Sequence, residues 1–99
     1  SHWSRTVQID VVAINWQTHD ILLGECKWGA DAVDRKVVRE LIAKAPRVLA
    51  DLPKGGASWR VHYALFARAG VTPAAEKELA EQGGIVVDLA RLYHDLAEE

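Results

Sequence analysis

The chain has 99 residues, of which 49% are hydrophobic and 26% charged, with a formal net charge of −2 and one cysteine. This composition is typical of one soluble globular domain, and the slight acidity argues against a strongly basic nucleic-acid binder, so any DNA contact must come from a local patch. No apolar run reaches the roughly 18 residues of a membrane span, no signal peptide is recognisable, and a lone cysteine cannot form an internal disulfide, so we expect a cytoplasmic location.

The first third of the chain predicts a β-hairpin. Residues 6–14 and 20–28 are rich in β-branched and apolar side chains, and the polar stretch 16–19 separates them. A hairpin loop of two or of four residues gives the same register, because both loops have the same centre. Either loop pairs Ile14 with Ile21 and Val12 with Leu23, and the extended register sets Asp10 opposite Glu25 and Gln8 opposite Lys27.

Alternation of side chains divides this hairpin into two faces. One face carries no charge and is predicted to be core: Val7, Ile9, Val11, Ala13, Leu22, Gly24, Cys26 and Trp28. The other face is apolar near the turn and polar at its far end, where four side chains are expected to gather: Gln8, Asp10, Glu25 and Lys27.

The rest of the chain predicts three helices and two strands. Asp31 or Asp34 can cap a first helix, whose apolar stripe Pro46 should kink or interrupt. A Gly-rich break at 53–58 precedes a strand at about 60–67, and Thr72-Pro73 opens a helix that stops near residues 83–84. A short strand at 85–88 and an amphipathic helix close the chain.

The resulting order, β-β-α-β-α-β-α, predicts an α/β domain with a mixed sheet and helices on both faces. Strands that are apolar on both sides favour this arrangement, because central strands have that character. The chain opens abruptly on Ser1-His2-Trp3, as if a strand were cut part-way. We therefore expect residues 1–99 to form a single, N-terminally truncated domain excised from a larger chain.

The charged end of the hairpin suggests a metal site. Two carboxylates directly opposite on paired strands, here Asp10 and Glu25, would have Cβ atoms about 4.5–5.5 Å apart and would repel each other. A hard cation held by both would remove the repulsion, and Mg²⁺ commonly binds through one or two carboxylates with water and a substrate phosphate. Lys27, on the same face, could reach that phosphate; alternatively, Lys27 pairs with both carboxylates in a purely structural ion cluster.

The segments "QIDVVAIN" and "ILLGECKW" resemble the PD-(D/E)XK nuclease superfamily, whose signature is an Asp on one core strand and Glu-x-Lys on the next. More narrowly, together with residues 65–71, they resemble the nuclease-like domain that follows the ATPase module in archaeal-type AAA ATPases. The resemblance implies a restriction-endonuclease-like fold and metal-dependent cleavage of DNA, with an ATPase module in the same full-length chain. It also implies that Asp10, Glu25 and the backbone carbonyl of Cys26 bind Mg²⁺ or Mn²⁺, and that Lys27 is the catalytic lysine.

Other functions stay open at this stage. Gln8 stands where related sequences often have Glu, and the leading helix and strand of the superfamily are missing or reduced, which favours a catalytically silent regulatory or assembly module of an ATPase. The truncated sheet edge could also pair with a second copy of the chain.

The basic side chains of the first helix have two interpretations. Five cations could follow a phosphate backbone or simply form a solvated helix face: Arg35, Lys36, Arg39, Lys44 and Arg47. Cys26 is expected to be a small buried apolar residue, and the four histidines lack the spacing that brings two ligands to one metal.

Overall fold

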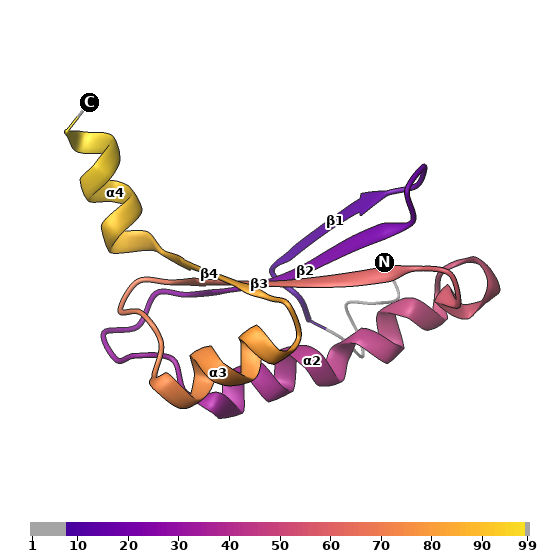
Figure 1. Ribbon diagram of the computed structural model, residues 1–99, viewed down its shortest axis with the longest axis horizontal. Coiled ribbons are helices and arrows are strands. Elements are labelled where there is room, and N and C mark those ends of the chain that lie inside the picture. Colours follow the sequence, from indigo (N-terminus) through magenta and orange to yellow (C-terminus); the bar gives the residue numbers. More distant parts are fainter. Residues whose placement is uncertain (1–7, 99) are drawn as a thin grey trace.

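The computed structural model describes residues 8–98. Its centre is an open four-stranded mixed sheet in the order β1-β2-β3-β4 (Figure 1), in which β1 and β2 are antiparallel and the other two pairs are parallel. The strands span Val11–Asn15 (β1), Asp20–Lys27 (β2), Arg60–Ala67 (β3) and Ile85–Asp88 (β4). The mixed α/β class is therefore confirmed.

The helices begin where the sequence places capping residues. The helices are α2 (Arg35–Ala50), α3 (Pro73–Glu81) and α4 (Leu89–Ala97), and a short 3₁₀ segment, η1, covers Pro53–Gly56. Asp34 accepts a hydrogen bond from Val37 N, and Thr72 accepts one from Ala75 N, so both N-terminal caps are those predicted. No helix of the described residues is both long and apolar enough to cross a bilayer.

Pro46 does not interrupt α2, which continues to Ala50. A proline inside a helix removes one backbone hydrogen bond, a loss that tertiary packing can outweigh. Val48, in the turn after Pro46, is 1% exposed and belongs to the core. Burial of this last turn accounts for the continuation of the helix past the proline.

The core lies on one face of the sheet, because α2 and α3 both cover that face (Figure 1). The expectation of helices on both faces was wrong. Strands are added in the order β2, β3, β4, and successive crossovers of one hand that add strands in one direction place their helices on the same side. The largest fully buried side chains come from this layer: Ile21, Leu23, Val38, Leu41, Val48, Leu65 and Leu79.

The hairpin has the predicted register over its strand pairs. Val12 pairs with Leu23 and Ile14 with Ile21, and four residues, 16–19, form the turn. The β1 strand begins only at Val11, so the pair between Asp10 and Glu25 is not part of the ladder. Val7, which was assigned to the apolar face, lies outside the described residues.

The face predicted to be wholly core is the uncovered one. Ala13 is exposed, Cys26 is half-buried, and Trp28 is 65% exposed. The core instead uses the opposite face of β2, where Ile21 and Leu23 are followed by Glu25. The carboxylate of Glu25 therefore lies at the end of the buried apolar row.

Candidate functional site

Glu25 is the one charged residue classed as buried among residues 8–98, with 8% exposure. It continues the row of Ile21 and Leu23 on the helix-covered face of β2, and its Cα partner on β3 is the fully buried Leu65. A carboxylate in such a position requires polar partners, because burial of an unpaired charge is costly. The fold meets this requirement with a lysine from α2.

Lys44 supplies the compensating charge. Its ammonium lies 2.8 Å from Glu25 Oε1 and also donates a hydrogen bond to the backbone carbonyl of Gln8. Lys44 is the residue of the predicted basic helix face that points inward, and its side chain is 28% exposed. It joins α2, β2 and the segment before β1 at one point.

Asp10 reaches β2 with its side chain, immediately beyond the last backbone pair of the hairpin. Its Oδ2 accepts a hydrogen bond of 2.9 Å from the backbone N–H of Cys26. Partial desolvation, with a smaller contribution from the charges of Asp10 and Glu25, raises the pKa of the Cys26 thiol. Both carboxylates therefore act on the same short stretch of β2, and the raised pKa favours the neutral thiol of Cys26.

Lys27 is not the partner of the two carboxylates. Its side chain is exposed and forms no hydrogen bond or ion pair with another residue of the described part of the chain. The structural ion pair that the sequence suggests between Lys27 and the carboxylates is formed by Lys44 instead. The backbone of Lys27 does have a partner, because its carbonyl accepts a 2.9 Å hydrogen bond from Arg68 N.

The candidate ligands for a hard divalent cation are the carboxylates of Asp10 and Glu25 and the backbone carbonyl of Cys26. No three His, Cys, Asp or Glu side chains within residues 8–98 are grouped so that they could hold a metal ion. Each of the two carboxylates has one oxygen engaged, by Cys26 N or by Lys44, and its second oxygen accepts no hydrogen bond from residues 8–98. Two carboxylates and the Cys26 carbonyl fit the oxygen preference of Mg²⁺, which usually completes its shell with water.

The other predicted phosphate contacts lie on the outer side of α2. Arg39 Nε donates to both carboxylate oxygens of Glu78 at 3.0 Å, and Arg35 Nε lies 3.9 Å from the same carboxylate. Lys36 is exposed. Two of these cations thus tie α2 to α3, and contact with nucleic acid stays a prediction for all of them and for Lys44.

A shallow recess lies beside this centre on α2. It has a volume of about 340 Å³ and is lined by Glu40, Ala43, Lys44 and Arg47. Lys44 belongs both to this recess and to the ion pair with Glu25, whereas Glu25 itself does not line the recess.

Sequence reasoning missed a polar cluster at the other end of the sheet. Asp20 Oδ1 lies 2.8 Å from His62 Nε2 and 2.9 Å from Arg60 Nε. The hydrogen bond from His62, those from Thr18 and Arg60, and the Arg60 charge lower the pKa of Asp20 well below its usual range. The three side chains meet because β2 and β3 are parallel and adjacent, which the sequence does not specify.

Comparison with known proteins gives a partial match. Residues 1–41 are similar to a family described as archaeal and bacterial proteins of unknown function. The matched segment contains Asp10, Glu25, Cys26 and Lys27 and ends within α2, before Lys44. No curated protein and no solved structure matches the chain.

Proposed function

We propose that this chain is a metal-dependent nuclease domain of the PD-(D/E)XK type, with a restriction-endonuclease-like core, that hydrolyses phosphodiester bonds of DNA. The observation that supports the proposal most is the approach of Asp10 to Cys26 N, directly beside the buried Glu25. Two carboxylates from different strands are costly neighbours unless a cation compensates them. Glu25 already has an ammonium partner, whereas among residues 8–98 the Asp10 side chain has only the neutral amide of Cys26 as a partner.

Each residue has a defined part in this proposal. Asp10, Glu25 and the Cys26 carbonyl would hold Mg²⁺ or Mn²⁺, which when bound lowers the pKa of a coordinated water and offsets charge on the phosphate. Lys44 positions Glu25 through their 2.8 Å contact. The exposed ammonium of Lys27 is available for the scissile phosphate and stabilises the negative charge that develops there.

The test is cleavage of supercoiled plasmid with Mg²⁺ or Mn²⁺, paired with calorimetric titration of Mn²⁺. We expect Glu25→Gln to abolish both DNA cleavage and Mn²⁺ binding. Lys27→Ala should lower cleavage about 10²-fold or more while Mn²⁺ binding is retained. Lys77→Ala is the matched control, since Lys77 is an exposed cation on α3 and is not among the predicted phosphate contacts. Equal background cutting by wild type and Lys27→Ala would rule out the nuclease.

A second candidate is a catalytically silent module that regulates or assembles an ATPase carried on the same full-length chain. It is favoured by the ion pair in which Lys44 engages Glu25, since that pair stabilises the carboxylate without any metal. This candidate predicts a folded protein that neither binds Mn²⁺ nor cuts DNA. It further predicts that deletion of the domain changes the ATPase rate of the full-length chain, and an unchanged rate would exclude it.

A further inference from the structure

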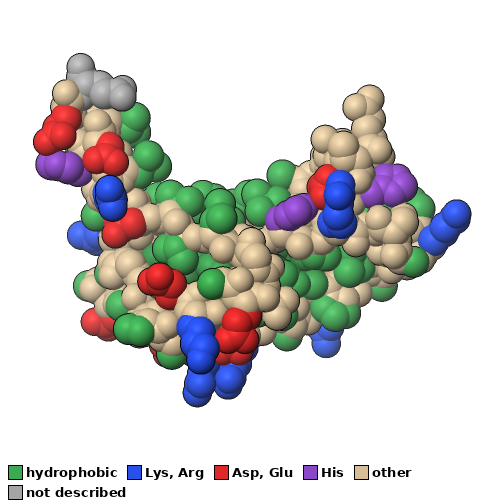
Figure 2. Space-filling model, viewed as in Figure 1, with side chains coloured by type: hydrophobic (Ala, Val, Ile, Leu, Met, Phe, Trp, Pro, Cys, Tyr) green, Lys and Arg blue, Asp and Glu red, His purple; other side chains and the backbone are tan. Residues whose placement is uncertain are grey.

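The face of the sheet opposite α2 and α3 is apolar, and no helix among residues 8–98 packs flat on it. Figure 2 shows hydrophobic side chains along the concave upper side of the molecule, between α4 at one end and the β1–β2 hairpin at the other. Strand pairing assigns to this open face the polar cluster of Asp20, Arg60 and His62 at the hairpin end and, over the rest, an apolar set: Val11, Ala13, Leu22, Gly24, Cys26, Ala64, Phe66, Ile85 and Val87. Ile85 is 56% exposed.

Helix α4 rises from one end of this open face without a buried residue of its own (Figure 1). It has nine residues, and its apolar side is exposed: Leu92 by 44%, Tyr93 by 77% and Leu96 by 60%. Helices shorter than about 12–15 residues are marginal in water unless tertiary packing supports an amphipathic face. The helix therefore needs an apolar surface against which to pack.

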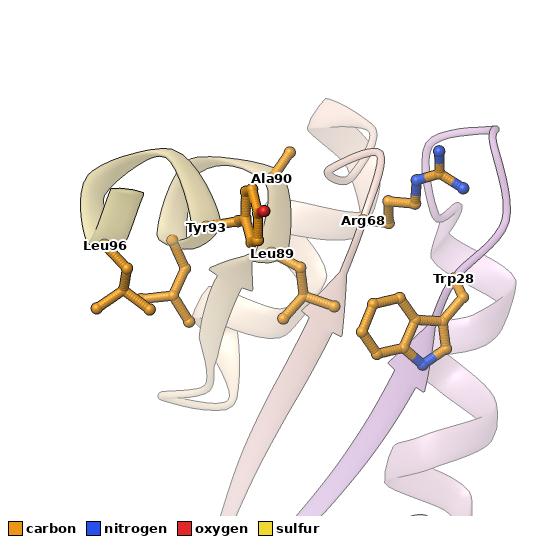
Figure 3. Close-up of a pocket in the computed structure, with 7 residues that line it drawn as sticks. Trp28, Arg68, Leu89, Ala90, Tyr93 and Leu96 are labelled. Carbon is orange, nitrogen blue, oxygen red and sulfur yellow. The ribbon is translucent and has the colours of Figure 1, made fainter. Parts of the chain in front are cut away.

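An apolar groove lies between α4 and the end of β2. It has a volume of about 590 Å³, and Figure 3 shows the rings of Trp28 and Tyr93 and the Arg68 side chain around it. Its remaining lining is aliphatic: Leu89, Ala90, Leu92 and Leu96. By alternation along β2, Trp28 belongs to the open face, so the groove and the open face form one surface.

We propose that two copies of this chain form a two-fold dimer in which α4 of each copy docks into the Trp28 groove of the other. The apolar side of α4 lines the groove together with Trp28, so a two-fold axis can pack this surface of one copy against the same surface of the other. This contact uses the open face rather than the edge of the sheet. It is also independent of whether Asp10 and Glu25 bind a metal.

The available area agrees with a dimer. Aromatic side chains bury about 150–250 Å² each, so Trp28 and Tyr93, at 65% and 77% exposure, offer roughly 300 Å² per copy. Ile85, Leu92 and Leu96 add on the order of 150 Å². Two copies therefore reach about 900 Å², and the half-exposed floor of the open face brings the total past the roughly 1,000 Å² of a specific interface.

The charges around the groove are complementary between copies. Arg68 lines the groove and forms no ion pair within the described part of the chain. The docking helix carries Asp95 and Glu98 near its C-terminal end, where the exposed Asp95 lies 3.9 Å from Arg91 and the exposed Glu98 lies 3.0 Å from His94. A second copy of α4 thus brings acidic groups to the one cation of the groove, whereas an acid-poor apolar peptide would leave Arg68 without a partner.

The experiment is sedimentation equilibrium of the wild-type protein and of single variants over a wide concentration range. We expect a dimer whose dissociation constant rises at least tenfold in Leu92→Glu and in Leu96→Glu. Lys77→Glu is the matched control, because Lys77 is exposed on α3 and does not line the groove, and it should change the constant less than threefold. Circular dichroism should show all three variants folded, since none of these residues belongs to the core.

Three results would overturn the proposal. The first is a wild-type protein that stays monomeric up to millimolar concentration. The second is a dimer that both leucine variants leave intact, which would point to pairing through the sheet edge instead. The third is an equal loss in Lys77→Glu, which would show that added charge rather than the apolar groove decides association.

Discussion

Replacing Lys44 with methionine tests how the buried carboxylate is stabilised. The substitution keeps most of the aliphatic side chain but removes the ammonium that contacts Glu25 Oε1 at 2.8 Å and the carbonyl of Gln8. Glu25 would then be a carboxylate at 8% exposure without its cation. We expect Lys44→Met to lower the free energy of unfolding.

The expected loss is about 2 kcal/mol. Removal of one partner from a fully buried pair costs about 3–5 kcal/mol, and a hydrogen bond to a charged group contributes about 1.5–3 kcal/mol. Water reaches this pair, because the side chains of Lys44 and Glu25 are 28% and 10% exposed, so the loss should fall below the range for a fully buried pair and within the range for a charged hydrogen bond. For a domain of this length the loss corresponds to a fall in Tm of about 10 °C.

Urea unfolding followed by circular dichroism measures the change, with Lys36→Met as the control from the exposed side of α2. In the Lys44→Met background, Glu25→Gln should cost less than in wild type by about 1 kcal/mol or more, because the neutral amide needs no cation. A Lys44→Met protein within 0.5 kcal/mol of wild type, or a cycle without coupling, would refute this account.

Three further predictions concern stability. Leu65→Ala should lower the free energy of unfolding by about 3 kcal/mol in urea titrations, since Leu65 is fully buried in the core. Hydrogen bonding by His62 lowers the pKa of Asp20 below its unfolded value of about 3.9, so Asp20 stabilises the fold above that pH and this stabilisation is lost as the pH falls toward the folded pKa. The difference in unfolding free energy between wild type and Asp20→Asn should therefore shrink below about pH 4. A difference that does not change with pH would contradict this prediction. Gly56→Ala should cost about 1–3 kcal/mol, because Gly56 has φ +77° and an added Cβ would lie 2.8 Å from a leucine side chain, whereas Gly29→Ala meets nothing within 4 Å and should change Tm little.

Local sequence patterns predict the strands and helices of this fold, because turn length, side-chain alternation and helix capping act between neighbouring residues. The loop centre and the alternation of apolar residues specify the hairpin register of Val12 with Leu23. Capping chemistry places the starts of α2 and α3 at Asp34 and Thr72. Pro46 shows the limit of such rules, since burial of the following turn outweighs the broken hydrogen bond.

The candidate site also has one part that the sequence predicts and one part that only the structure shows. The sequence places Asp10 and Glu25 on adjacent strands, and the structure brings the first to the β2 backbone beside the second. The sequence does not identify which lysine contacts Glu25. Lys27 has the nearer position in the sequence, but its side chain is exposed, and the contact belongs to Lys44, on a helix that packs over the sheet.

The sequence by itself determined the strands, the helices and their caps, and the pair of acidic residues, because hydrogen-bonding propensity and side-chain periodicity act over a few neighbouring positions. Tertiary structure decided that α2 and α3 share one face of the sheet, that Lys44 neutralises Glu25, and that the other face stays apolar and open. These outcomes depend on strand order and on the direction of each crossover, which join residues far apart in the chain and leave no periodic pattern in it.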